Sequence, residues 1–75
     1  MRRVGEVVRT AQGLAIVRCP EGDSPEIGTM VVDENLSEIG RIVDVFGPVS
    51  RPYVAVTPDE RAMLPKLLGG KLYAR

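Results

Sequence analysis

Short hydrophobic runs broken by glycine and proline predict a chain built mainly of β-strands. A hairpin-like connection at residues 10–13 separates the first two runs, and a proline-rich loop at 20–25 follows them. Pro58 ends the hydrogen-bonded ladder of the last run before the chain changes character, because proline has no N–H group to donate. The predicted strands, in chain order, are Val4–Arg9, Leu14–Cys19, Thr29–Val32, Ile39–Phe46 and Tyr53–Val56.

The pattern changes after Pro58. Residues 59–64 suit one or two helical turns, with acidic residues in the first turn and Pro65 closing the helix. Lys71–Ala74 is predicted as a returning strand. Closely spaced strands with one helical turn favour a closed barrel, because closure removes exposed sheet edges. We therefore predict an all-β, six-stranded barrel with a short C-terminal helical turn, forming a single domain over residues 1–75.

The segment Ile39–Phe46 departs from the pattern of a half-buried strand, in which one face is apolar and the other polar. Large apolar residues occur on both of its faces, which consist of Ile39, Arg41, Val43 and Val45 on one side and Gly40, Ile42, Asp44 and Phe46 on the other. A barrel interior accepts one set only, unless a bulge at Gly40 changes the alternation. The other set predicts an exposed apolar patch, which usually marks an interaction site.

Phe46 and Tyr53 flank a loop stiffened by Pro48 and Pro52. They either plug the mouth of the barrel or form an exposed protein-binding edge, since rigid aromatic side chains are good anchors. The two-sided strand favours the protein-binding edge. Base stacking on these rings is less favoured, because aromatic residues make up 4% of the chain and no basic cluster surrounds them.

The charges balance overall but are unevenly distributed. Lys+Arg and Asp+Glu both number 10, so no net positive field attracts nucleic acid. Residues 21–38 carry six acids and no Lys or Arg, whereas residues 1–18 carry four Arg and one acid. The acidic segment is either a solvated region or a rim that faces a basic partner.

Few residues in the chain are suited to catalysis or to metal binding. The chain has no His, and Cys19 is its single thiol, which fits a small apolar strand residue and a reducing compartment. Asp33 and Glu34 would point to opposite faces of a strand, and Asp44 is a lone carboxylate. We expect no enzyme activity, no cofactor, no metal and no small-molecule substrate. The absence of a long apolar run and of a signal-like start predicts a cytoplasmic protein without membrane contact.

The stretch from Ile39 to Val49, Ile-Gly-Arg-Ile-Val-Asp-Val-Phe-Gly-Pro-Val, resembles the glycine–arginine-rich-protein subunit of H/ACA ribonucleoproteins in its short archaeal form. The segments Ile27–Asp33, Pro52–Val56 and Gly70–Tyr73 extend the resemblance over most of the chain. A related assembly factor of the same particle has a similar core. The lack of long extensions favours the mature subunit.

This resemblance implies a six-stranded barrel like the second domain of translation factors, acting as a non-catalytic subunit in RNA-guided pseudouridylation of rRNA. It implies docking on the catalytic subunit of the pseudouridine synthase, placement of its mobile thumb loop, and faster substrate turnover. Guide RNA would be met only indirectly, in keeping with the absence of Arg-Gly dipeptides. The implied interface residues are Ile39, Gly40, Ile42, Val45, Phe46, Gly47, Pro48, Pro52 and Tyr53.

Two alternatives come from other functional classes. Residues 37–45 also resemble the recurrent strand of PRC-barrel-like domains, which would indicate an interaction domain in ribosome maturation. The Phe46-Gly47-Pro48-Val49 sequence that follows favours the pseudouridylation family instead. The third class is a barrel that binds single-stranded RNA, whose binding would depend steeply on salt.

Overall fold

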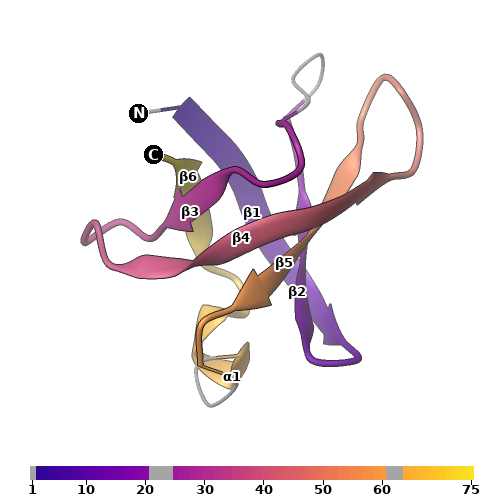
Figure 1. The fold of residues 1–75 in the computed structure, drawn as a ribbon. Coiled ribbons are helices and arrows are strands. Elements are labelled where there is room, and N and C mark those ends of the chain that lie inside the picture. Colours follow the sequence, from indigo (N-terminus) through magenta and orange to yellow (C-terminus); the bar gives the residue numbers. More distant parts are fainter. Residues whose placement is uncertain (1, 21–24, 61–63) are drawn as a thin grey trace.

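A computed structural model describes residues 2–20, 25–60 and 64–75. Six antiparallel strands close into a barrel in the order β1-β2-β5-β4-β3-β6 (Figure 1). The all-β, six-stranded prediction is thereby confirmed. The elements are β1 (Arg2–Ala11), β2 (Leu14–Arg18), β3 (Met30–Val32), β4 (Glu38–Phe46), β5 (Tyr53–Pro58), α1 (Leu64–Leu67) and β6 (Lys71–Ala74).

The hairpin between β1 and β2 is tighter than the four-residue connection predicted. Ala11 pairs with Leu14, so Gln12 and Gly13 alone form the loop. Both have positive φ, 53° and 78°, which is the conformation of a two-residue type I′ turn. This turn matches the right-handed twist of the two strands and sets their register.

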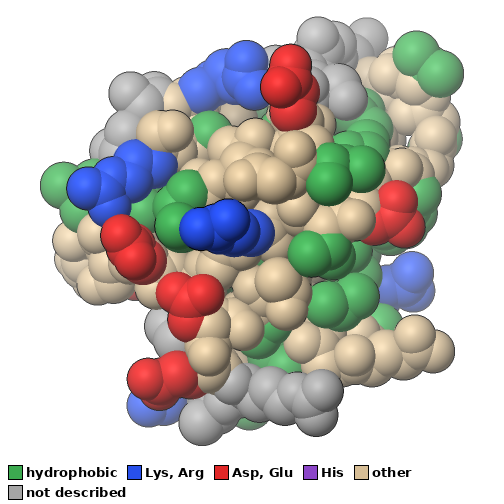
Figure 2. All heavy atoms as spheres, viewed as in Figure 1, with side chains coloured by type: hydrophobic (Ala, Val, Ile, Leu, Met, Phe, Trp, Pro, Cys, Tyr) green, Lys and Arg blue, Asp and Glu red, His purple; other side chains and the backbone are tan. Residues whose placement is uncertain are grey.

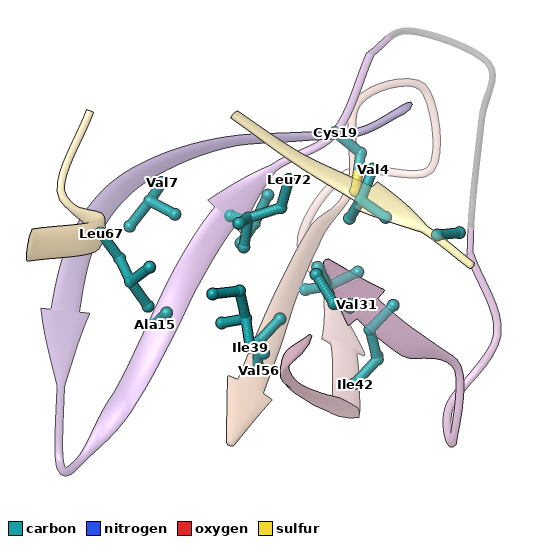
Figure 3. Close-up of a cluster of buried hydrophobic side chains, with 13 residues drawn as sticks. Val4, Val7, Ala15, Cys19, Val31, Ile39, Ile42, Val56, Leu67 and Leu72 are labelled. Atoms are coloured by element: carbon teal, nitrogen blue, oxygen red, sulfur yellow. The ribbon is translucent and has the colours of Figure 1, made fainter. Parts of the chain in front are cut away.

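The barrel interior is filled with aliphatic side chains from every strand and from α1 (Figure 3). Leu67 enters from α1 beside Val7 and Ala15 and covers that end of the barrel. Cys19 is buried in the same cluster, as predicted for a small apolar residue, although it lies just beyond the end of β2 at Arg18. The described part of the chain has no buried polar or charged side chain. Packing of apolar groups therefore holds the barrel together.

The predicted helix over residues 59–64 is wrong. The helical turn is Leu64–Leu67, and residues 61–63 lie outside the described part of the chain. Pro65 does not close the helix but stands in its first turn, where a missing N–H group costs no hydrogen bond. Asp59 continues the strand pairing instead, because its N–H donates to the carbonyl oxygen of Ile39 at 2.7 Å.

Two irregularities in β4 explain its two-sided pattern. Ile39 and Ile42 are both buried in the core although their positions differ in parity, and half-buried Val45 packs against the same cluster. On the β5 side, Ile42 pairs with Val56 but Asp44 pairs with Ala55, so Val43 is an extra, bulged residue. On the β3 side, the register shifts between Val31 and Val32, opposite Ile39.

β4 therefore changes face twice, first at the irregularity at Ile39, next to the position expected at Gly40, and again at the bulge at Val43. Gly40 serves another purpose, because it pairs with Val31 on one side and Pro58 on the other. A Cβ at Gly40 would collide with the backbone carbonyl of Thr57. Glycine is required here for the close approach of β4 and β5.

Candidate protein-docking face

The aromatic rings of Phe46 and Tyr53 stack on the outside of the barrel. The two residues are direct partners in the β4–β5 ladder. Their ring centroids lie 5.8 Å apart with an interplanar angle of 17°. Phe46 is 38% exposed and Tyr53 is half-buried, so the pair presents apolar area to solvent. The interpretation of these rings as a plug for the barrel mouth is not supported, since neither belongs to the core cluster.

A groove of about 240 Å³ extends from this aromatic pair towards β1 and is lined by Val8, Arg9, Phe46 and Tyr53. Ile16 and Ala55 are ladder partners on β2 and β5, the two strands that separate β1 from β4. Each alternates with core residues on its strand, so both side chains lie on the outer face. Both are nonetheless 5% exposed or less, which gives the outer face an apolar floor.

Two further apolar side chains extend this surface. The bulge turns Val43 outward, where it is 43% exposed, and Val49 in the β4–β5 loop is 97% exposed. Figure 2 shows hydrophobic side chains at the surface over the right half of the view, where β4 ends and the loop projects. We call the set Val8, Ile16, Val43, Phe46, Val49, Tyr53 and Ala55 the outer apolar face.

The β4–β5 loop is held in place by its own backbone. Gly47 has a φ of 89°, and a Cβ there would lie 2.9 Å from the Tyr53 ring. The Arg51 N–H donates to the Pro48 carbonyl at 3.1 Å, which closes a turn. Buried Pro52 accepts a hydrogen bond of 3.0 Å from the N–H of Cys19. The loop thus presents Val49 from a defined conformation.

The structure divides the predicted interface residues into two groups. Half-buried Tyr53 and exposed Phe46, Gly47 and Pro48 lie on or beside the outer apolar face, whereas half-buried Val45 packs against the core cluster. Ile39, Gly40, Ile42 and Pro52 are buried and support this face from within. Whether either group contacts a partner remains a prediction.

The predicted interface did not include Val8, Ile16, Val43, Val49 and Ala55. Ile16 could have been found from the pattern, because it interrupts the alternation between Ala15 and Val17 with a third apolar residue. Val43 could not, because its orientation depends on a bulge whose position the pattern leaves open. Val8 likewise lies at a register shift, between Val7 and Arg9.

The carboxylates considered for catalysis have local structural partners. Asp33 Oδ1 accepts hydrogen bonds from the N–H groups of Asn35 and Ser37 at 2.8 and 3.0 Å and so organises the β3–β4 turn. Asp44 is exposed and accepts from the Val45 N–H at 2.9 Å. Within residues 2–20, 25–60 and 64–75, no cluster of three metal-ligating side chains occurs. None of the helices described is long and apolar enough to cross a membrane.

Comparison with known proteins agrees with the resemblance noted in the β4 segment. The chain is 38% identical over 50 residues to an uncharacterized protein of Methanocaldococcus jannaschii, a match that covers 67% of this chain and 58% of the relative. The chain thus spans less than two thirds of that relative. The family model described as the Gar1/Naf1 RNA binding region matches residues 1–75 and favours this family over the PRC-barrel alternative. That description names RNA binding and no reaction. A match over the full sequence, on a closed six-stranded barrel, shows that the chain belongs to the Gar1/Naf1 family.

Proposed function

We propose that the protein is a non-catalytic subunit of an H/ACA ribonucleoprotein and docks on the catalytic subunit of the pseudouridine synthase. Its place would be the cytoplasm of an archaeal cell, in the modification of rRNA. Family membership supports the association with this particle. The observation that carries the docking proposal is the stacked, partly exposed Phe46–Tyr53 pair on an apolar outer surface.

The outer apolar face has the properties of a binding hot spot. Stacking and strand pairing already hold the two rings, so little side-chain entropy remains to be lost on binding. Ile16 and Ala55 on the same outer face are almost fully buried, so the surface around the rings is apolar. Val49 extends from the rigid loop as a second apolar contact. Aromatic anchors with such surroundings usually dominate binding energy.

Docking of this kind would act on turnover without contributing a catalytic group. A bound subunit shifts a mobile loop of its partner only if it contacts the two loop states differently. We propose that contact with the barrel favours the thumb-loop state that releases product, since release often limits turnover. Multiple-turnover pseudouridylation would then accelerate on addition of this protein, while the single-turnover rate would change much less.

The docking proposal is tested by measuring binding of the chain to an archaeal synthase catalytic subunit by isothermal titration calorimetry. Phe46→Ala is expected to weaken binding by roughly 2 kcal/mol or more, about 30-fold in Kd. Leu36→Ala is the matched control, because Leu36 is 59% exposed but lies in the β3–β4 turn. Equal affinities for the wild type and a folded Phe46→Ala variant would refute the assignment of the docking face.

A further inference from the structure

Three arginines from separate parts of the chain line one groove at the end of the barrel. Arg3 comes from β1, Arg18 ends β2, and Arg51 belongs to the β4–β5 loop. The groove has a volume of about 310 Å³, and Gly5, Glu6, Cys19 and Pro20 complete its lining. We call it the arginine groove. The fold creates it, since Arg3 and Arg51 are 48 positions apart in the sequence.

The charge of the arginine groove differs from that of the whole chain. Its lining carries three guanidinium groups and the single carboxylate of Glu6. All four of these side chains are exposed. Among the residues that the structure describes, none of the three arginines forms an ion pair, whereas Arg75 pairs with Glu38. Acidic residues of the β3–β4 turn line a different pocket, with Leu67 and Lys71.

Neighbouring strands hold the backbone of Arg18 on both sides. Gly5 faces the end of β2 so closely that a Cβ there would collide with the Arg18 carbonyl. Arg18 also pairs with Glu6 on one side and with Tyr53 on the other. The arginine groove therefore borders the aromatic pair through the Arg18–Tyr53 partnership. A ligand in the groove would pass beside the outer apolar face without needing its rings.

We propose that the arginine groove binds the phosphodiester backbone of RNA. Guanidinium groups offer planar, forked donors that match phosphate oxygens, and several of them in a row neutralise successive phosphates. An acidic protein segment would also be attracted to the three arginines, but the RNA-binding description of the family favours RNA as the ligand. This proposal uses residues outside the outer apolar face and stands independently of synthase docking. It differs from the expectation, implied by the family resemblance, that guide RNA is contacted only through a partner.

The proposal is tested with a fluorescein-labelled, single-stranded RNA of 12 nucleotides and the wild-type chain, by fluorescence anisotropy at increasing NaCl concentrations. Three phosphate contacts predict that log K falls against log[NaCl] with a slope of about −2. Each of Arg3→Gln, Arg18→Gln and Arg51→Gln is expected to reduce the magnitude of that slope by about 0.7. The triple variant should lose at least about tenfold in affinity at 50 mM NaCl.

The matched control removes the same number of positive charges elsewhere. Arg41→Gln, Lys66→Gln and Arg75→Gln combined lie outside the arginine groove and should leave most of the RNA affinity intact. Far-UV circular dichroism verifies that both triple variants fold. Equal losses in the two triple variants would overturn the proposal in favour of diffuse charge attraction, and so would absence of RNA binding by the wild type.

Two additional measurements separate this proposal from its competitors. Stronger binding of a labelled polyglutamate of equal length than of the RNA would overturn it in favour of an acidic protein segment. Phe46→Ala should retain RNA binding while losing synthase binding, because Phe46 does not line the arginine groove. RNA binding that persists when synthase docking fails, or the reverse, would show which of the two proposals is wrong.

Discussion

Phe46 and Tyr53 are joined twice, as ladder partners of β4 and β5 and as a stacked ring pair with centroids 5.8 Å apart. The ring contact therefore stabilises the end of the hairpin that carries the exposed loop. Aromatic pairs of this kind contribute about 0.5–1.5 kcal/mol beyond area burial. We expect a coupling of that size in a double-mutant cycle of Phe46→Ala and Tyr53→Ala, measured by urea denaturation. A coupling near zero would mean that the stack does not hold the loop.

Alanine substitutions at the adjacent residues Ile42 and Val43 should have separate effects, one on the free energy of unfolding and the other on synthase binding. Ile42 is 1% exposed and Val43 is 43% exposed because of the bulge. Ile42→Ala is expected to lower the free energy of unfolding by roughly 2–5 kcal/mol through loss of core packing. Val43→Ala should change it by less than about 0.5 kcal/mol but weaken synthase binding. Urea denaturation and titration calorimetry on both variants check this, and a large loss of stability in Val43→Ala would place the bulge elsewhere.

Gly40 is predicted to tolerate no side chain. The Cβ of Gly40→Ala would collide with the Thr57 carbonyl, so β4 and β5 would have to separate. We expect a loss of at least about 3 kcal/mol, at the upper end of overpacking costs. Gly69→Ala is the control, since its φ is 80° but no atom lies within 4 Å of the added Cβ, and it should cost roughly 1 kcal/mol. Thermal denaturation of both variants provides the comparison, and equal costs would contradict the close-approach argument.

Leu67 should be the residue through which α1 stabilises the barrel. It is 8% exposed and belongs to the core cluster, whereas neighbouring Leu68 is 58% exposed. Leu67→Ala is expected to lower the free energy of unfolding by about 2–4 kcal/mol. Leu68→Ala should stay within about 0.5 kcal/mol of the wild type. If the two variants lose the same stability in urea, α1 does not cover the end of the barrel in solution.

The order and approximate positions of the strands could be predicted because glycine, proline or turn-forming polar residues separate the runs of β-branched residues. The helix could not be placed correctly from the sequence. Asp59 and Glu60 resemble a helical first turn, but the backbone of Asp59 is occupied by its hydrogen bond to Ile39. That bond links residues 20 positions apart, and no local pattern reveals it. Tertiary pairing overrode the local preference.

The candidate surfaces were predicted in part. The aromatic residues and the loop of the docking face were evident from the sequence, because a two-sided strand followed by Phe-Gly-Pro is unusual. The bulge at Val43 decides which apolar residues at the end of β4 face outward, and its position could not be predicted from the sequence pattern. The arginine groove was hidden for a different reason. Net charge averages over the whole chain, whereas the groove gathers Arg3, Arg18 and Arg51 through the fold.

The pairing of β6 has a consequence for how the barrel forms during synthesis. Lys71–Ala74 is the last strand of the barrel to emerge from the ribosome, yet it pairs with both β1 and β3. Until it emerges, the nascent chain holds two unpaired strand edges that invite association with other chains. Closure must therefore follow translation of all six strands. A partner that covers these edges early would protect the newly made protein from aggregation.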